Sequence, residues 1–274
     1  MHSQRVAFQG EPGAYGEIAA LDYFPKAKLL PAKSFQTVFE ILESGKADFA
    51  VVPIENSIEG SINETYDLLL RTSMVVYGEI YQRIRHCLIA NPGTSNSEIT
   101  AAYSHPQALA QCRAYLQKKG LEAIPTYDTA GAVKLVKQEK MMQAAAIASK
   151  RAANLYGMRI LEESIEDKKN NYTRFLILSR AQSKPTGHDG TSIIFSVRHT
   201  PGALYGILEE FAKRRINLTK IESRPTKEVP WEYNFYVDFE GHSHDKEIRE
   251  LIKAVKKKTL FIKILGSYKR GKLY

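Results

Sequence analysis

The first 180 residues alternate short apolar runs with segments of helical spacing. RVAFQ (Arg5–Gln9) and FAVVPI (49–54) are strand-sized runs, much shorter than the roughly 18 apolar residues of a membrane helix. Between them, four apolar residues follow a helical spacing: Phe35, Val38, Phe39 and Leu42. The pattern predicts two strands that flank a helix, which begins at about Ser34 and ends at Gly45.

The same alternation continues along the rest of this region. Ser61 and Glu64 form a capping box ahead of a further predicted helix. In PQALAQCRAYLQKKG, Pro106 suits the first helical position and Gly120 the end of one continuous helix. FLILS (175–179) is the last predicted strand. Strands that alternate with helices in this way predict a layered α/β domain.

A second patterned region follows the polar stretch AQSKPTGHDG (181–190). Its segments TSIIFSV, PGALYGILEEFAKRRI, NLTKIESRP, EYNFYVDF, HDKEIRELIKAVKKK and FIKILGSY predict the order βαββαβ, which is ferredoxin-like. A chain of 274 residues has room for two domains of about 150 residues each. We therefore predict an α/β domain over 1–181, a linker over 182–190 and a ferredoxin-like domain over 191–274.

Polar residues gather where the predicted strands end. GEPGAYG (10–16) follows the first strand, ENS (55–57) follows FAVVPI, SHPQ (104–107) follows a third strand, and Ser149 follows a fourth. Ligands bind at this edge of open α/β sheets. Helix N-termini at the same edge offer free N–H groups and a positive dipole end to anions. The sequence therefore predicts a small, anionic, polar ligand in a cleft between two lobes.

Charge and composition exclude several classes of partner. The formal net charge is +9, and residues from Ser183 onward carry 18 Lys+Arg against 11 Asp+Glu, most densely at 256–258. Because these lysines end a predicted helix, where positive charge suits the dipole, we expect a solvated helix end and neither nucleic-acid nor membrane binding. Cys87 and Cys112 are too few for a disulfide scaffold, and the first residues lack a signal peptide's apolar core. We expect a cytoplasmic protein.

The motifs also argue against cofactor and metal chemistry. GEPGAYG is not a GxGxxG loop, and no Walker lysine follows it. His105 has no second His or Cys at ligand spacing, and the chain has no serine nucleophile elbow. We expect no metal, no cofactor and no covalent hydrolytic intermediate.

In their order along the chain, these strings resemble the prephenate dehydratase family. The matching segments are VAFQGEPGAYGEIAAL, VVPIENSIEGSI, SHPQALAQC, DTAGA, AAIAS and IEDKKNNYTRFLIL. In the last segment, Asn171, Thr173, Arg174 and Phe175 stand on motif positions. The tail resembles the family's regulatory ACT domain through PGAL (201–204) and NLTKIESRP (217–225).

The resemblance implies a two-lobed, periplasmic-binding-protein-like α/β catalytic domain, with lobes roughly over 1–76 plus 167–181 and over 77–166, followed by an ACT domain. It implies that prephenate loses carbon dioxide and hydroxide to give phenylpyruvate in phenylalanine biosynthesis. Two alternatives stay open: an arogenate dehydratase, and a non-catalytic two-lobed protein that senses an amino acid. The opening motif begins within ten residues of the N-terminus, so we expect a monofunctional enzyme without the chorismate mutase domain of some relatives.

The resemblance further implies the site residues. Thr173 is expected to donate to the leaving hydroxyl, and Glu55, kept protonated by burial, is the rival proton donor. Arg174 is expected to contact a substrate carboxylate through its planar guanidinium, and Phe175 to pack against the ring. Without the resemblance, the Thr173–Phe175 triplet is interpreted as a core strand with a surface arginine.

Further substrate contacts are expected from Asn56, Ser57, His105, Gln107 and Ser149. The family has Ser or Thr where this chain has Gly16, an acceptable N-cap residue that supplies no hydroxyl.

The ACT resemblance implies L-phenylalanine as an allosteric ligand, bound at a seam between two chains of a homodimer or homotetramer. One wall of that site is expected from the turn of Gly202, Ala203 and Leu204. The other wall is expected from Asn217, Leu218, Thr219, Glu222, Ser223 and Arg224.

Overall fold

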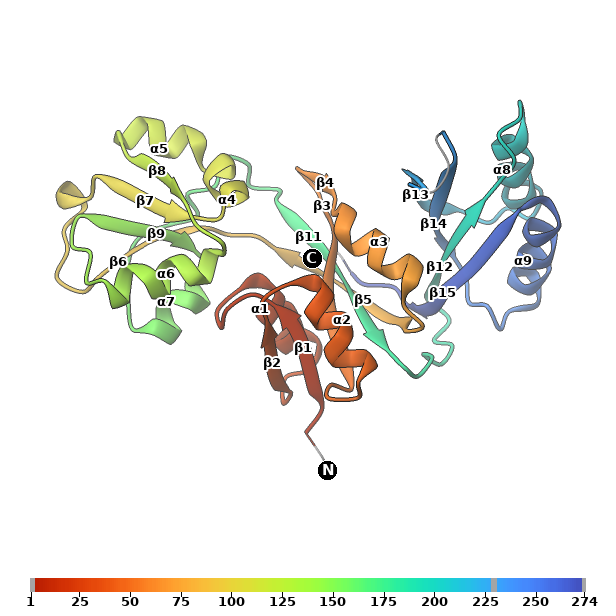
Figure 1. Ribbon diagram of the computed structural model, residues 1–274, viewed down its shortest axis with the longest axis horizontal. Helices are drawn as coiled ribbons and strands as arrows, with labels where there is room; N and C mark the ends of the chain where they lie inside the picture. The colour runs from red at the N-terminus through yellow and green to blue at the C-terminus, as the bar shows by residue number, and fades with distance from the viewer. Residues whose placement is uncertain (1–2, 228–230, 273–274) are drawn as a thin grey trace. The chain divides into compact units, whose positions relative to one another are not determined.

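The structure is a computed structural model that describes residues 3–227 and 231–272. Two compact units make up the chain. Unit 1 comprises Met1–Thr65 and Tyr81–Phe175, and unit 2 comprises Tyr66–Ile80 and Leu176–Tyr274. The chain passes from one unit to the other within three elements: helix α3 (Asn63–Arg71), strand β5 (Val75–Arg83) and strand β11 (Tyr172–Ser179) (Figure 1).

The first sheet of unit 1 is built around a central strand from the N-terminal segment. Its strands are β1 (Arg5–Gln9), β2 (Lys28–Ala32), β3 (Phe49–Asn56), the short β4 (Gly60–Ser61) and the start of β11. They run in the order β11-β3-β1-β2, with β1 parallel to β2 and β3. Helices α1 (Tyr15–Tyr23) and α2 (Phe35–Glu43) pack on this sheet. The helix predicted after Ser34 is confirmed, because the Ser34 hydroxyl accepts a hydrogen bond from the Thr37 backbone N–H at 3.2 Å.

Helix α3 begins later than its predicted capping box. Ser61 pairs with Glu55 across the β3–β4 ladder, so its backbone is extended and the helix begins at Asn63.

The second sheet of unit 1 has the order β10-β6-β9-β7-β8. Its strands are β6 (Cys87–Ala90), β7 (Ala101–Ser104), β8 (Glu122–Pro125), β9 (Ala144–Ala148) and β10 (Arg159–Glu163). The helices around it are the 3-10 turn η1 (Asn96–Glu98), α4 (Pro106–Gln111), α5 (Arg113–Lys119), α6 (Thr129–Gln138) and α7 (Lys150–Tyr156). Strand β9 is buried throughout, and four of its five residues are alanine, which allows helices to pack closely against the sheet.

The helix predicted over 106–119 is broken at Cys112. The backbone there leaves the helical region, and a residue from a distant segment takes over the bonds of the interrupted turn. The Asp167 backbone N–H donates to the Gln111 carbonyl at 2.8 Å, while the Asp167 carboxylate accepts from the Ala114 N–H at 3.1 Å. Gln111 therefore becomes the last residue of α4, with its side chain held at the break.

The two sheets of unit 1 are joined by direct contacts of the loop after β1 and of helix α1 with the start of helix α7. The Ser149 hydroxyl donates to the Gly13 carbonyl at 2.6 Å, and Arg151 pairs with Glu17 at 2.8 Å. Gly13 has a φ of +98°, and a Cβ atom at that position would lie 2.7 Å from the Ala152 Cα. Only glycine fits both the backbone and the contact.

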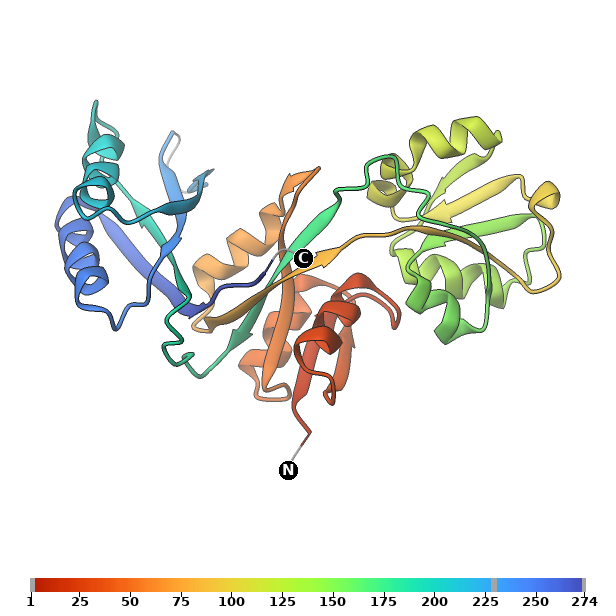
Figure 2. The ribbon, with the colours of Figure 1, turned by 180° about the vertical axis from the view of Figure 1, so that it is seen from behind.

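Unit 2 contains the ferredoxin-like fold predicted for the C-terminal region. Its elements are β12 (Asp189–Ser196), α8 (Ala203–Lys213), β13 (Leu218–Pro225), β14 (Tyr233–Glu240), α9 (Lys246–Lys258) and β15 (Phe261–Lys269). Within the unit the strand order is β13-β14-β12-β15-β5-β11. Helices α8 and α9 lie on one face, where they bury an apolar core against β12 and β14 (Figure 2). Because unit 2 also holds 66–80 and the end of β11, the predicted domain limits at 181 and 191 stay predictions.

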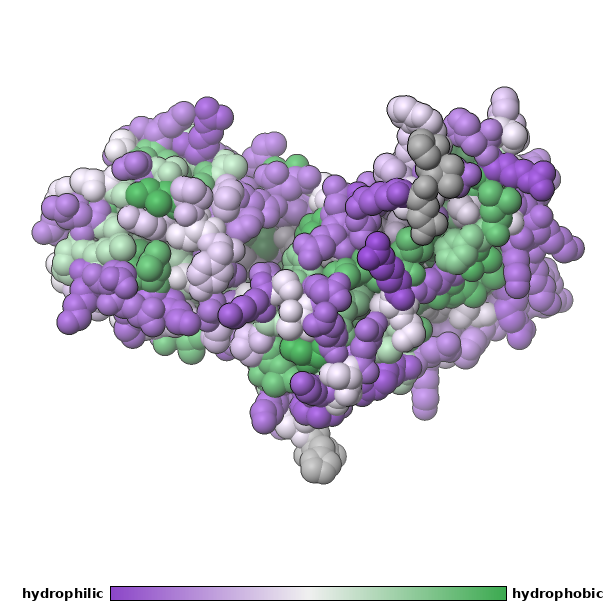
Figure 3. Space-filling model, in the orientation of Figure 1, coloured by the Kyte–Doolittle hydropathy of each residue, from purple (hydrophilic) through white to green (hydrophobic). Residues whose placement is uncertain are grey.

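The positions of the charged residues on the surface agree with the sequence prediction. Lys256, Lys257 and Lys258 occupy the last turn of α9, as predicted for a solvated helix end. On the face shown in Figure 3, hydrophilic residues cover most of the surface and apolar residues form smaller patches. Among residues 3–227 and 231–272, no helix has both the length and the apolar character to cross a membrane.

Both cysteine thiols are buried and free, which predicts that they resist alkylation in the folded protein. Cys87 is 2% exposed and Cys112 is fully buried. Burial raises the pKa of Cys87 to about 11, so only about one molecule in a thousand carries the reactive thiolate at pH 8. Burial also raises the pKa of Cys112. We expect iodoacetamide at pH 8 to add to neither thiol in the native protein and to both after denaturation, measured by intact mass. Rapid alkylation of the native protein would contradict this burial.

Candidate functional site

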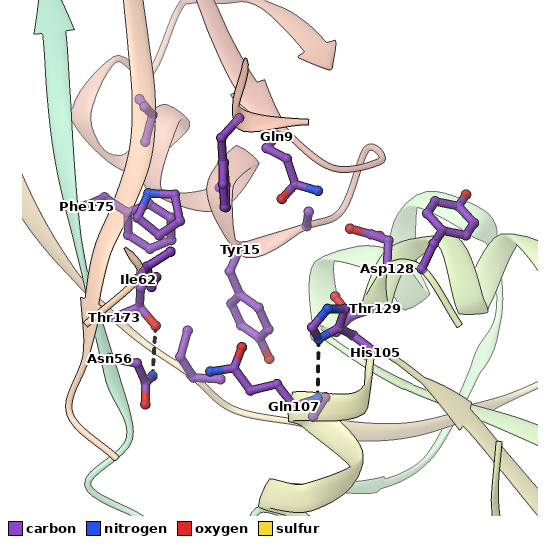
Figure 4. A pocket seen from close by; sticks show the side chains of 18 of the residues that line it. Gln9, Tyr15, Asn56, Ile62, His105, Gln107, Asp128, Thr129, Thr173 and Phe175 are labelled. Carbon is purple, nitrogen blue, oxygen red and sulfur yellow. Dashed lines mark hydrogen bonds between the residues drawn. The ribbon is translucent and has the colours of Figure 1, made fainter. Parts of the chain in front are cut away.

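A cavity of about 480 Å³ lies in unit 1, between elements of its two sheets. This volume is within the range of about 300–1,000 Å³ of small-molecule sites. Its polar lining consists of Gln9, Tyr15, Lys33, Ser34, Asn56, Glu64, His86, His105, Gln107, Gln111, Tyr127, Asp128, Thr129 and Thr173. Figure 4 shows the Tyr15 side chain reaching between the Thr173–Asn56 pair and Gln107.

Several helices begin at this cavity. The first residues of α1 and α2 line it, and so do residues at the start of α4 and α6. Because a helix N-terminus carries partial positive charge and free N–H groups, this arrangement favours an anionic ligand. Lys33, directly before the Ser34 N-cap of α2, adds a full positive charge to the lining.

Asn56 sets the orientation of Thr173. The Asn56 Oδ1 accepts hydrogen bonds from the backbone N–H groups of Ile58 (2.9 Å) and Glu59 (3.0 Å), which identifies the other end of the amide as its NH2 group. That NH2 donates to the Asn171 Oδ1 at 2.8 Å and to the Thr173 Oγ1 at 3.0 Å. Since Thr173 accepts from Asn56, its own hydroxyl proton points elsewhere. Within the described part of the chain no group accepts that proton, so Thr173 can donate into the cavity.

The network continues to a second donor. The Asn171 NH2 donates to the Gln111 Oε1 at 2.9 Å, and the His86 Nε2 lies 2.9 Å from the same oxygen. Because that oxygen accepts two bonds, the Gln111 NH2 is the donor that this residue adds to the lining. The His86 Nδ1 lies 3.3 Å from the Tyr15 hydroxyl, which donates to the Arg85 carbonyl. Burial lowers the pKa of His86 and raises the pKa of Tyr15, so both side chains are neutral near pH 7.

Arg174 does not belong to the lining, contrary to the role predicted for it. Successive side chains of a strand point to opposite faces. Thr173 and Phe175 on β11 both line the cavity, and Arg174 between them points to the other face. It is 8% exposed. The structure therefore gives no support for a carboxylate contact by Arg174.

Three other predicted contacts also lie outside the lining. Glu55 stands on β3 beside Asn56 and is engaged in the β3–β4 pair. The Ser57 hydroxyl donates to the Asn170 carbonyl at 3.0 Å and accepts from the Tyr172 N–H, which ties the end of β3 to the start of β11. Ser149 caps α7 and bonds to Gly13. The Ser57 and Ser149 side chains therefore hold segments of the walls of the site together.

His105 and Gln107 do line the cavity, from the start of α4. The His105 Nδ1 accepts a hydrogen bond from the Gln107 N–H at 3.3 Å, so His105 acts as the N-cap of that helix. Gly16 also lines the cavity, but it lies inside α1, whose N-cap is Ala14. Gly16 is therefore not the N-cap of this helix. A Cβ there would lie 3.3 Å from the Gln9 carbonyl oxygen, which is a tight contact.

Two carboxylates share the lining with Lys33. Asp128 is 7% exposed and caps α6, where its Oδ1 accepts from the Gly131 N–H at 2.7 Å. Burial raises the pKa of Asp128. Glu64, in the first turn of α3, is exposed at the edge of the cavity. Within the described ranges, no group of three or more His, Cys, Asp or Glu residues could hold a metal ion.

Sequence reasoning missed His86, Gln111, Tyr15 and Lys33. Gln111 and Tyr15 lie inside segments that match the family's motifs, and this match could have identified them as candidate site residues. His86 precedes Cys87 at the start of a buried strand, and only the folded structure shows that it lines the cavity and bonds to Gln111.

The predicted regulatory residues lie in unit 2. Gly202, with a φ of +79°, is the N-cap of α8, and Ala203 begins that helix. The second predicted wall begins at Asn217, directly before β13, and continues along β13, which is the edge strand of the unit's sheet.

Comparisons with known proteins agree with this architecture. The family model described as prephenate dehydratase matches residues 6–183, and the ACT domain model matches residues 191–257. The chain is 44% identical to arogenate dehydratase/prephenate dehydratase 2 of Arabidopsis thaliana, over 96% of this chain and 72% of that protein.

Two solved structures are similar over nearly the whole chain. One is the prephenate dehydratase of Arthrobacter aurescens in complex with L-Phe, with a TM-score of 0.89 and 32% identity over 97% of this chain and 90% of that one. The other is GqqA, described as a novel type of quorum quenching acylase, with a TM-score of 0.90 and 32% identity over 97% and 98%. The predicted fold class, a two-lobed α/β domain followed by an ACT domain, is confirmed. Since the family model spans more than half of its length, the chain belongs to the prephenate dehydratase family.

Proposed function

We propose that this protein is a prephenate dehydratase, a carbon–oxygen lyase that converts prephenate into phenylpyruvate and is regulated by L-phenylalanine through its ACT domain. The observation that carries the proposal is the cavity of unit 1, where helix N-termini suited to carboxylates surround the two neutral donors Thr173 and Gln111.

The reaction needs little more than anion binding and a hydrogen-bond donor. The ring carboxylate of prephenate leaves as carbon dioxide, its bonding electrons move through the ring, and the C4–O bond breaks to release hydroxide, which takes up a proton. We assign to the Thr173 hydroxyl the contact with the departing oxygen, because Asn56 occupies its acceptor side. The Gln111 NH2 is the second donor beside it. Donors aimed at developing negative charge stabilise a transition state most effectively when they are held in place beforehand.

The remaining lining residues bind and orient the substrate. We assign Lys33 and the N-termini of α1 and α2 to the two carboxylates, in place of Arg174. Phe175 packs against the ring, and His105 and Gln107 contribute polar contacts from α4.

The test is to incubate the purified protein with prephenate and to follow the absorbance of phenylpyruvate. Turnover that is absent while prephenate still binds would favour the non-catalytic amino-acid-sensing alternative.

Arogenate is the second candidate substrate. It carries an ammonium group where prephenate has its keto oxygen, and the Glu64 and Asp128 carboxylates in the lining are groups that an ammonium ion could contact. Steady-state kinetics with both substrates side by side would decide the preference through the ratio of the kcat/KM values.

The described contacts do not favour the acylase reaction named for GqqA. A hydrolytic nucleophile is activated by a base within hydrogen-bond distance. In the described part of the lining, both ring nitrogens of His86 face Gln111 and Tyr15, and the His105 Nδ1 accepts from the backbone. Thr173 is paired with Asn56.

Replacing Arg174 by lysine is expected to affect stability more than catalysis. Because Arg174 lies on the opposite face of β11 from Thr173 and Phe175, we expect its guanidinium not to contact the substrate. We expect kcat and KM for prephenate to stay within about threefold of wild type. We expect the melting temperature to fall, because a lysine ammonium cannot make the paired hydrogen bonds of a planar guanidinium. If KM rose more than about tenfold while the melting temperature stayed unchanged, that result would support the substrate-carboxylate contact first predicted for Arg174.

Regulation by phenylalanine is proposed to act through helix α3. Its first turn supplies Glu64 to the cavity lining, and the rest of the helix is held inside unit 2. Arg224 on β13 pairs with Asp67 at 3.1 Å, and the Tyr236 hydroxyl donates to the Tyr66 carbonyl at 2.9 Å. Lys263 on β15 donates to the carbonyls of the last turn, at Leu69 (3.0 Å), Leu70 (2.9 Å) and Thr72.

The proposal is supported by Arg224, which is predicted for one wall of the phenylalanine site and pairs with Asp67 on the helix that also supplies Glu64 to the lining. Carbonyls of a last helical turn lack intrahelical partners, so the Lys263 ammonium fixes the end of α3. A ligand that rearranges β13 changes what holds α3, and with it the position of the first turn.

The oligomer is proposed to form through the ACT domains. Strand β13 is an edge strand of unit 2, along which exposed and half-buried residues alternate, and Ile221 is 45% exposed. Edge strands with open backbone groups are surfaces for pairing with a second chain. Sedimentation velocity with and without phenylalanine would distinguish monomer, dimer and tetramer.

A further inference from the structure

His86 is the most deeply buried titratable side chain among the described residues of the lining, at 2% exposure. Its backbone is held by the segment before β11, because the His86 N–H donates to the Glu166 Oε2 at 3.0 Å and the His86 carbonyl accepts from the Ile165 N–H at 3.0 Å. Its ring stands edge-on to Tyr15, with centroids 5.7 Å apart. Position and orientation of the imidazole are therefore both determined by the protein.

Both ring nitrogens of His86 face protein groups and not the open cavity. The Nε2 lies 2.9 Å from the Gln111 Oε1, and the Nδ1 lies 3.3 Å from the Tyr15 hydroxyl. An imidazole engaged in this way is not placed to exchange a proton with a ligand. Its effect on the site passes through Gln111.

The side chain of Gln111 has two possible amide orientations. In the observed one, its oxygen accepts from the His86 Nε2–H and from the Asn171 NH2, and its NH2 is left for the cavity. In the reversed one, the Gln111 NH2 would face two other donors, and its carbonyl oxygen would face the ligand. A carbonyl oxygen beside a departing hydroxide would repel the developing negative charge.

We propose that His86 is a positioning residue for the dehydration: its Nε2–H, together with Asn171, holds the Gln111 amide with its NH2 group toward the cavity, as the second donor beside Thr173. The inference rests on the proposed dehydratase function. Since the two donors are joined through Asn171 and Asn56, they form one preorganised unit.

The test compares two replacements of His86. Glutamine places its amide nitrogen near the position of the imidazole Nε2, whereas asparagine, one methylene shorter, reaches only the position of Nδ1. We expect His86→Asn to lower kcat roughly 10–100-fold, because the Gln111 oxygen loses a buried donor, with KM changed less than about threefold. We expect His86→Gln to keep kcat within about fivefold of wild type.

Two controls separate positioning from general damage. His242 in unit 2 is equally buried at 2% exposure, so His242→Asn should lower the melting temperature to a similar extent and leave kcat unchanged. In a Gln111→Glu background, where no NH2 remains to be oriented, His86→Asn should have little further effect on kcat.

Each outcome has a clear meaning. Equal losses of kcat in His86→Asn and His86→Gln, or additive losses with Gln111→Glu, would overturn the positioning role while the dehydratase function stands. A wild-type protein that makes no phenylpyruvate would overturn the proposed function, and the inference with it.

Discussion

Replacing Thr173 by alanine is expected to lower kcat for prephenate by roughly 10²–10⁴-fold, with a smaller change in KM. The reason lies in the direction of the network: Asn56 donates to the Thr173 oxygen at 3.0 Å, so the hydroxyl proton is the one free to meet the departing oxygen. Alanine removes that proton and leaves the Asn56 NH2 with Asn171 as its remaining partner. Steady-state kinetics by phenylpyruvate absorbance measures the effect.

Serine at position 173 is the matched control, because it keeps a hydroxyl on the same Cβ. We expect Thr173→Ser to retain most of kcat, with the remaining loss due to the freer rotation of an unbranched side chain. A change of less than about fivefold in Thr173→Ala would show that the hydroxyl is not the donor. That result would not favour Glu55 as the donor, because the structure does not place Glu55 in the cavity lining. Gln111 would instead become the principal donor.

Local patterns predicted much of the fold because the interactions that form those elements are local. Ser34 caps α2 through a bond to Thr37, three residues away, and the apolar spacing of the C-terminal region reproduces the βαββαβ order. The break between α4 and α5 could not be predicted in this way. It is made by Asp167, which lies 53 residues from Ala114 in the sequence and replaces the helical bonds at that point.

The candidate site was also predicted only in part, because some of its residues are identified locally and others depend on distant contacts. Asn56, Thr173 and Phe175 were predicted from motif positions, and the structure brings them to one cavity. Arg174 was predicted as a carboxylate contact from the same motif, although the period of two along a strand places it on the opposite face from Thr173 and Phe175. His86 and Gln111 depend on a chain of hydrogen bonds that joins β3, β11, α4 and β6, and no single segment of sequence contains that chain.

Replacing Asp67 by asparagine is expected to weaken inhibition by phenylalanine about 5–150-fold, the range of typical coupling free energies, while kcat without phenylalanine changes little. Burial opposes the ionisation of Asp67, but hydrogen bonds from Lys227 and Arg224 outweigh it and keep the pKa of this carboxyl below its usual value. The asparagine variant loses this charge pairing, which weakens the contact between β13 and α3. The half-inhibitory concentration of phenylalanine measures the change.

Phenylalanine binding must be measured on the same variant, by calorimetry on the full chain, because the two readouts separate coupling from binding. Retained binding with lost inhibition is the result expected if α3 carries the coupling, since a ligand shifts an equilibrium only through its differential affinity for the two states.

Arg270→Met is the matched control: Arg270 pairs with Glu240 on β14, so its loss removes an ion pair of the same unit and should leave inhibition unchanged. Unchanged inhibition in Asp67→Asn would instead exclude the Arg224–Asp67 pair from the coupling. Binding and inhibition lost together would place Asp67 in the phenylalanine site itself and make α3 part of its wall.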